Sequence, residues 1–398
     1  MDFMIDDAQA GAQRNVPMWK IAAIPVVVVG LLAGIFASTR LANQPMVSVG
    51  PVVAYATVHD QDAVLVAYGR TGGTVGPPFG SGDTWQERVA ALSLDTGELL
   101  WDVQLHDRHG WERGVLAVAD GLAYVASDRG LSIVKADDGS IVEDTVGEHY
   151  VESFNGYNID PRLDAVVALS DSGVVEAVPL GTTEPAAVTD DVAEAWRTTL
   201  LDKSTPTADS DFGIIHVDPA AMPDGMELPD GTTISIPKPY RSPDPQLMRG
   251  GKVLARLDGL TKKELVYEVV RTPAALATPA QLAEGTDMFS HYHSSAAPLG
   301  VDRGVVLVRG ERADDPRVDE LRMFDIDTGD TLAVVGNLDG YVRATATPNG
   351  SILVIAAAAG SGLDDDRVII LRPDGRTTST QIGDTDFWGR TRANVATL

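Results

Sequence analysis

Val89-Ala90-Ala91-Leu92-Ser93-Leu94 runs into Asp95-Thr96-Gly97 and then into Glu98-Leu99-Leu100-Trp101. An apolar strand leads to a polar turn that ends in glycine, and a second strand follows the turn. The same order of residue types returns at Leu131–Gly139 and at Val174–Gly181. Gly97, Gly139 and Gly181 are 42 residues apart. Such a regular spacing indicates a repeated β-structure.

Later copies of the pattern end in Asp327-Thr328-Gly329 and Pro373-Asp374-Gly375, whose glycines are 46 residues apart. In the clear copies another apolar run precedes the first strand, which gives two hairpins in each repeat. Repeats of about 40–45 residues with four short strands are typical of β-propeller blades. With weaker copies at 228–231 and at 252–257 plus 265–270, the sequence predicts an all-β fold, a β-propeller of seven blades within a range of six to eight. The stretches 186–212 and 273–290 are expected to be insertions.

Composition is that of a globular protein, because 44% of the residues are hydrophobic and 22% are charged. The net charge of −26 is carried by the residues after position 40. So acidic a surface repels phosphates, and nucleic acid is therefore excluded as a partner. The chain has no cysteine, which excludes disulfides and thiolate chemistry.

Ile21 to Thr39 forms a run of 19 uncharged residues, with Trp19 and Lys20 before it and Arg40 after it. This length and these flanks predict one transmembrane helix, and a cleaved signal peptide is the alternative. More positive charge precedes the run than follows it, which predicts a cytoplasmic tail over 1–20 and an extracytoplasmic domain. The expected order is thus a tail, a helix over 21–39, a linker over 40–46 and a propeller over 47–398, held at the cell membrane.

Leu92-Ser93-Leu94-Asp95-Thr96-Gly97-Glu98-Leu99-Leu100-Trp101 resembles the repeat of the pyrroloquinoline-quinone-like propellers, in which a Thr-Gly turn is followed by a Leu-Trp strand. Asp327-Thr328-Gly329 repeats the turn, but Glu143 and Ala333 stand where the tryptophan of the repeat is expected. The resemblance implies the fold. It leaves activity open, because the family contains both dehydrogenases and assembly scaffolds.

A dehydrogenase of that family would hold the quinone cofactor and calcium, yet this chain lacks the cysteine pair that stacks beneath the quinone. A propeller hydrolase with paired carboxylates is a further alternative. His291 and His293 lie on one face of a predicted strand without a visible third metal ligand. The glycine-rich run Arg70–Gly76 lacks the Gly-Lys-Ser/Thr ending of a phosphate loop. We therefore predict no cofactor and no metal, and expect a binding or assembly scaffold for a protein or cell-envelope partner rather than an enzyme.

The partner is expected to bind at three long connections between equivalent strands, at 70–87, 310–320 and 360–366. The matching connections at 127–130 and 170–173 are tight turns. Long loops in a compact domain are often functional, and equivalent loops of consecutive blades emerge on one face. The predicted contact residues are Arg70, Phe79, Trp85, Arg309, Arg312, Arg317, Asp364, Asp365 and Asp366.

Overall fold

A computed structural model describes residues 46–72, 84–107, 110, 112–143, 150–204, 225–228, 230–236, 246–266, 300, 303–359, 365–385 and 391–397. The chain divides into two compact units, Met1–Gln44 and Pro45–Leu398, and all described residues belong to the second. The predicted transmembrane segment Ile21–Thr39 lies outside the described residues. Among the residues that are described, no helix combines the length and the apolar character needed to cross a bilayer.

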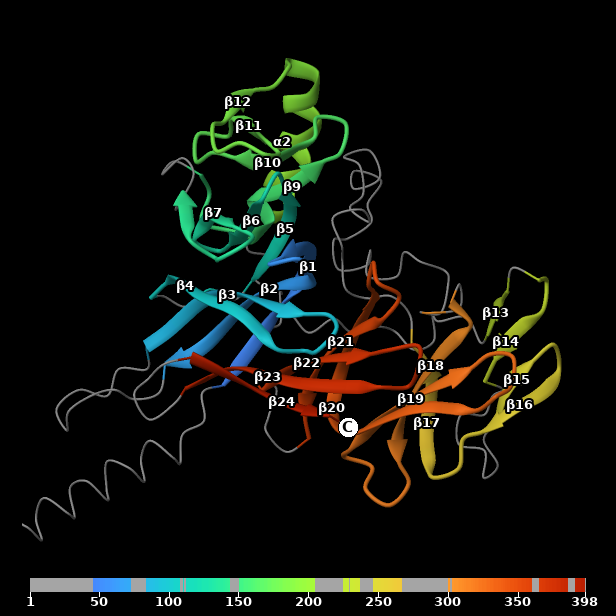
Figure 1. The fold of residues 1–398 in the computed structure, drawn as a ribbon. Helices are drawn as coiled ribbons and strands as arrows, with labels where there is room; N and C mark the ends of the chain where they lie inside the picture. Colours follow the sequence, from blue (N-terminus) through green and yellow to red (C-terminus); the bar gives the residue numbers. More distant parts are fainter. Residues whose placement is uncertain are drawn as a thin grey trace, which may run out of the picture. The chain divides into compact units, whose positions relative to one another are not determined.

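The second unit consists mostly of β-strands, which follow one another in antiparallel meanders (Figure 1). We call each group of four consecutive strands a module. Module 1 contains β1 (Val47–Val58), β2 (Gln61–Gly72), β3 (Thr84–Ser93) and β4 (Leu99–His106). Module 2 contains β5 (Arg113–Ala119), β6 (Leu122–Ser127), β7 (Gly130–Lys135) and β8 (Ile141–Glu143). Module 3 contains β9 (Tyr157–Asp160), β10 (Ala165–Leu169), β11 (Val175–Pro179) and β12 (Ala186–Ala187).

The later part of the chain supplies three further modules within the described ranges. Module 4 contains β13 (Gly225–Glu227), β14 (Thr233–Ser235), β15 (Gln246–Arg249) and β16 (Lys252–Arg256). Module 5 contains β17 (Leu260–Leu265), β18 (Val305–Arg312), β19 (Asp319–Asp325) and the first half of β20 (Thr331–Ala346). Module 6 contains the second half of β20, then β21 (Ile352–Ala358), β22 (Asp366–Leu371) and β23 (Thr377–Thr385), with β24 (Thr391–Thr397) at its edge. Modules 5 and 6 therefore share one strand.

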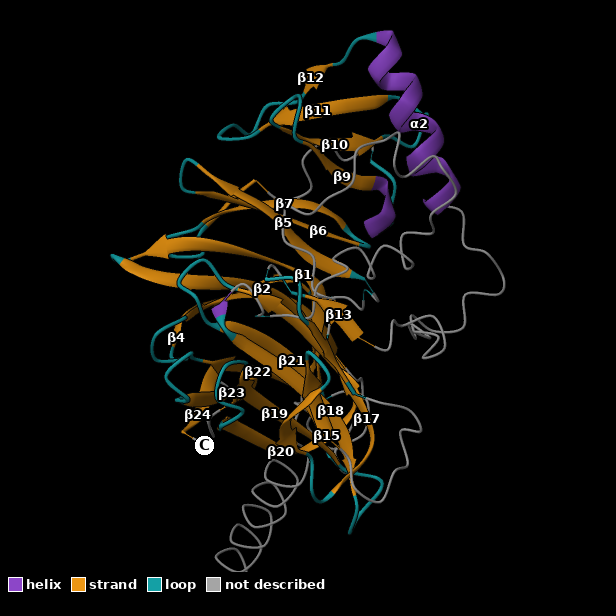
Figure 2. Cartoon of the chain, turned by 90° about the vertical axis from the view of Figure 1, so that its right-hand side faces the viewer, coloured by secondary structure: helices purple, strands orange, loops and turns teal. Residues whose placement is uncertain are grey.

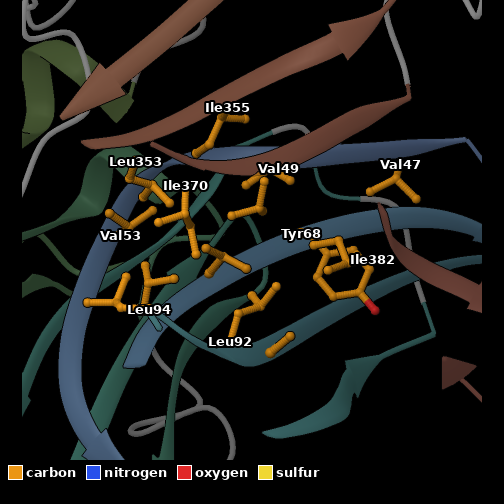
Figure 3. Close-up of a cluster of buried hydrophobic side chains, with 14 residues drawn as sticks. Val47, Val49, Val53, Tyr68, Leu92, Leu94, Leu353, Ile355, Ile370 and Ile382 are labelled. Carbon is orange, nitrogen blue, oxygen red and sulfur yellow. The ribbon is translucent and has the colours of Figure 1, made fainter. Parts of the chain in front are cut away.

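Both faces of the inner strands are buried, which explains their unbroken apolar sequences. Successive side chains of a strand point to opposite faces of the sheet. In β2, Val64, Val66 and Tyr68 pack against residues of module 6, while Ala63, Leu65 and Ala67 pack against residues of module 2. Figure 3 shows the first of these cores, with Tyr68 beside Ile382 of β23. Module 1 thus lies between modules 2 and 6.

Apolar cores also join further pairs of modules in the described part of the chain. One apolar cluster joins modules 2 and 3, another joins modules 4 and 5, and a third joins modules 5 and 6. The other face of module 3 is covered by helix α2 (Asp190–Ser204), which lies beside β10 and β11 (Figure 2). Trp196 of this helix is fully buried among side chains of β10 and β11. The indole Nε1 of Trp196 donates a 2.8 Å hydrogen bond to Oδ2 of Asp160. The expected insertion at 186–212 therefore contains a helix that completes a core.

The recurrent glycine has a packing role at the contact between modules. Gly139 has a φ of +71°, and a Cβ at this position would lie 2.6 Å from the ring of Trp101. The same indole donates a 2.9 Å hydrogen bond from Nε1 to the carbonyl oxygen of Ala136. Gly97 has a φ of +74° and lies in the same way against Thr378 and Thr380 of module 6. The 42-residue spacing thus repeats a contact between neighbouring sheets, and the first module makes that contact with the last.

Candidate functional site

The described ends of the three long connections lie along one side of the second unit. Val47 pairs with Arg70 at the end of β2 and forms a parallel bridge with Asp365 before β22. Leu338 of β20 pairs with Asp319 at the start of β19 and with Ala358 at the end of β21. The strand ends of modules 5, 6 and 1 therefore meet in that order. We call the side that carries the β2–β3, β6–β7, β18–β19 and β21–β22 connections the connection face.

Arg70 is buried at the contact between modules 1 and 6. Its Nε donates to Oε1 of Gln86 at 2.7 Å, and its Nη1 donates to the carbonyl oxygen of Gly383 at 2.9 Å. The side chain is only 6% exposed. Arg70 therefore joins the first module to the last, a role that its place beside a glycine-rich loop did not indicate.

Asp366 has a comparable role on the other side of this contact. Its Oδ2 accepts hydrogen bonds from the backbone nitrogen of Val49 at 2.8 Å and from Nη2 of Arg343 at 2.7 Å. Nη1 of Arg343 donates to the carbonyl oxygen of Val49 at 2.8 Å. Asp365 accepts a 3.1 Å hydrogen bond from Gln381. The carboxylate of Asp366 thus binds the first strand to module 6, whereas the carboxylate of Asp365 bonds within module 6.

The three arginines of the β18–β19 connection form ion pairs within their own hairpin. Arg309 pairs with Asp319 at 2.7 Å, and this pair is largely shielded from solvent. Arg312 pairs with Asp314 at 2.5 Å, and Arg317 pairs with Asp315 at 3.0 Å. Because each cation has an acidic neighbour, the hairpin does not form a strongly basic patch.

Trp85 is partly buried at the start of β3, opposite Thr71 of β2. This position places the indole at the edge of the connection face. Phe79 and Asp364, the remaining predicted contact residues, lie outside the described residues. His291 and His293 also lie outside them.

A group of ionisable side chains that the sequence did not reveal lies where modules 1, 2 and 3 meet on the connection face. Glu87 comes from β3, Glu112 precedes β5, and Asp128 lies in the β6–β7 turn. We call these three residues the carboxylate cluster. Asp128 accepts hydrogen bonds from the backbone nitrogens of Glu112 at 2.9 Å and Phe154 at 3.1 Å. It therefore ties the start of β5 to the short 3-10 helix η1 (Phe154–Gly156) of module 3.

Glu87 is the most deeply buried member of the cluster, with 2% of its surface exposed. Neither of its carboxylate oxygens accepts a hydrogen bond of ordinary geometry from the described residues. Burial raises the pKa of Glu87, and Arg113, Ser127 and His106 oppose the rise. Asp128 adds to it. The environment thus disfavours the ionised form of this carboxyl.

Glu112 titrates near neutral pH. Burial and then the charge of Asp128 raise its pKa to about 7, although a hydrogen bond from Asn155 opposes the change. Nδ2 of Asn155 donates that bond to Oε2 of Glu112 over 3.0 Å. Strongly shifted carboxyls often mark functional sites, and this one is also partly accessible to solvent.

Arg113 is the cation at the centre of the group. Its Nη1 donates to the carbonyl oxygen of Ser48 at 3.0 Å, and its Nη2 donates to that of Gly110. The guanidinium interacts favourably with Glu87, Asp128 and Asp366. One arginine therefore faces three carboxylates, and Asp366 has Arg343 as well.

Chemically, the group is suited to holding positive charge or protons. Both oxygens of Asp128 accept backbone hydrogen bonds, so the residue is tied down rather than presented to a substrate. Within the described ranges, no three histidine, aspartate or glutamate side chains are grouped so that they could hold a metal ion. No protein-family model matches the chain, and no curated protein matches it.

Proposed function

We propose that residues 47–398 form a β-propeller that acts as a binding or assembly scaffold. The observation that carries the proposal is the contact between the first and the last module. Val49 and Asp366, 317 residues apart in sequence, are joined by a hydrogen bond, and Val47 bridges Asp365. Apolar cores join module 6 to module 1, module 1 to module 2 and module 2 to module 3, and they join module 4 to module 5 and module 5 to module 6. Packing of the last module on the first is what a propeller ring requires. The described strands form two eight-stranded and two four-stranded sheets, which we interpret as six blades.

The contact between Trp101 and the turn at Gly139 supports membership of the pyrroloquinoline-quinone-like propellers. In that family the repeat tryptophan docks on the next blade, and Trp101 contacts module 2 through both its ring and its nitrogen. The resemblance does not decide between scaffold and dehydrogenase. We favour the scaffold because the described ends of the long connections of modules 5, 6 and 1 lie along one side, where a partner can contact them together.

We further propose that Ile21–Thr39 anchors the chain in the cell membrane, with residues 41–398 outside the cytoplasm. The uncharged run and the excess of positive charge before it support this topology. The partner is then a membrane or envelope protein. Protease added to intact spheroplasts should digest the β-domain, and complete protection would exclude this topology.

The scaffold proposal is tested by crosslinking the full-length protein in native membranes, followed by affinity capture. Trp85→Ala should weaken capture of the partner by about tenfold, because a tryptophan anchor commonly carries a large share of binding energy. Val253→Ala is a matched control, since Val253 is a 52% exposed apolar residue of β16. Equal capture by both variants would reject the site at Trp85. Dye reduction after addition of the quinone cofactor and calcium would instead identify a dehydrogenase.

A further inference from the structure

Glu87 points toward Asp128 across the backbone of Gly110. A Cβ built on Gly110 would collide with Oε1 of Glu87 and would lie 3.5 Å from Cβ of Asp128. The two side chains therefore approach the same point from modules 1 and 2. Glu87 is almost completely buried, and its oxygens accept no hydrogen bond of ordinary geometry from the described residues, although Ser127 lies close enough to oppose the rise of its pKa. Glu87 therefore has unused acceptor capacity inside the protein.

The charges around this point do not balance within the described residues. Glu87 and Asp128 share the Arg113 guanidinium, which also faces Asp366, and Asp366 pairs with Arg343 as well. The third member of the cluster, Glu112, lies beside Asp128. His106 lies opposite Glu87 on β4 and contributes positive charge only when it is protonated. Buried carboxylates without compensating charge take up protons or bind a cation.

We infer that the carboxylate cluster receives a lysine or arginine side chain of the protein partner. This inference rests on the scaffold function proposed above and specifies the chemistry of the partner. Glu112 is partly exposed at the connection face, Glu87 is buried, and both feel the charge of Asp128, so a long basic side chain suits the site. Its donors would supply the hydrogen bonds that Glu87 lacks.

Two properties of the chain favour a polypeptide cation. The net charge of −26 attracts basic segments over distances beyond direct contact. In the described part of the chain, the cluster also lacks the grouping of three ligating side chains that would hold a metal ion. A basic segment can be attracted by the net charge of the chain and can also bind the carboxylate cluster directly.

The inference is tested with a fluorescein-labelled hexa-arginine peptide, whose binding to the full-length protein is followed by anisotropy near physiological salt. Glu112→Gln should raise the Kd by about tenfold, the loss expected for one partly desolvated charge pair. Glu98→Gln, at the exposed β3–β4 turn, removes the same charge elsewhere and should change the Kd by less than about twofold. Equal effects of the two substitutions would show that only the overall field attracts the peptide, and would overturn the inference.

The pH dependence gives a second readout. Because a proton and the basic side chain compete for Glu112, lowering the pH from about 8 to about 6 should weaken peptide binding to wild type more than to Glu112→Gln. Glu87→Gln should also weaken binding, and its melting curve will show whether the fold is kept. If the peptide does not bind while Trp85→Ala still abolishes capture of the natural partner, the cationic site is wrong and the scaffold function stands.

Discussion

The indole Nε1 of Trp101 and the carbonyl oxygen of Ala136 are joined by a 2.9 Å hydrogen bond that links modules 1 and 2. The ring also lies against Gly139, which has no Cβ. A single side chain thus provides both the apolar and the polar contact between two sheets. Three further contacts of the described residues offer comparable tests.

Replacing Trp101 should separate these two contributions. Trp101→Phe keeps an aromatic ring and loses the hydrogen bond, so the free energy of unfolding should fall by about 1 kcal/mol. Trp101→Ala also leaves a cavity and should cost about 3–5 kcal/mol. Denaturant unfolding measures both values. Equal losses for the two variants would mean that ring packing contributes nothing.

Asp366 should contribute strongly to the contact between the first and last modules. Its ion pair with Arg343 is shielded, with side chains 10% and 18% exposed, so Asp366→Ala should destabilise the fold by about 3 kcal/mol. Asp366→Asn keeps an acceptor for the Val49 nitrogen and should cost less. Asp374→Asn is the control, because its pair with Arg376 is largely exposed and should contribute little to stability. A similar loss for Asp374→Asn and Asp366→Ala would contradict this assignment.

Asp160 should make the module 3 core sensitive to acid. Burial alone would raise its pKa, but hydrogen bonds from Arg162 and Trp196 outweigh burial and lower the pKa to about 2. A lowered folded-state pKa adds stability above the ordinary value of 3.8, and this stability is lost as the pH falls toward 2. The wild-type protein should therefore lose stability over this range relative to Asp160→Asn. Parallel pH curves for the two proteins would refute the prediction.

The contribution of Glu112 to the free energy of unfolding should depend on pH in the opposite direction. Its folded-state pKa of about 7 is above the ordinary value of 4.5, so the folded protein binds more protons between these values. The contribution of Glu112 is fully present below about pH 4.5 and is lost as the pH rises through 7. Glu112→Gln should remove this loss, which thermal unfolding in buffers across the range would detect. A wild-type curve with the same slope as the variant would exclude a raised pKa.

Much of the strand arrangement could be predicted from sequence, because apolar runs and turn glycines are both local features of the chain. Apolar runs such as 63–68 mark strands buried on two faces, and the glycines at 97 and 139 mark the turns after them. The predicted fourth and fifth copies were less accurate. The turn at 228–231 and the strand Lys252–Arg256 belong to one module, and β17 pairs instead with β18 of the next module. In short strands with few apolar residues, the alternation of apolar and polar positions is too brief to predict which strands pair with each other.

The candidate site depends on contacts that a linear pattern does not contain. Arg70 and Asp366 were predicted to face a partner because they flank long connections, yet the structure buries them between the first and last modules. Glu87 and Asp128 approach each other from separate hairpins, and neither lies in a motif. Only the register of β3 and the packing of module 2 bring them together.

The hydrogen bond between Val49 and Asp366 joins a strand that is synthesised early to one that is synthesised much later. The first module can therefore be completed only late in translation. The apolar face of β2 that contains Val64 and Val66 is covered by side chains between residues 353 and 382, which the ribosome makes long after β2. Until those residues are made, module 1 exposes this apolar surface to solvent, and exposed apolar surfaces promote aggregation. Nascent chains stalled before residue 340 should therefore bind chaperones, and release should follow translation of β21 to β23.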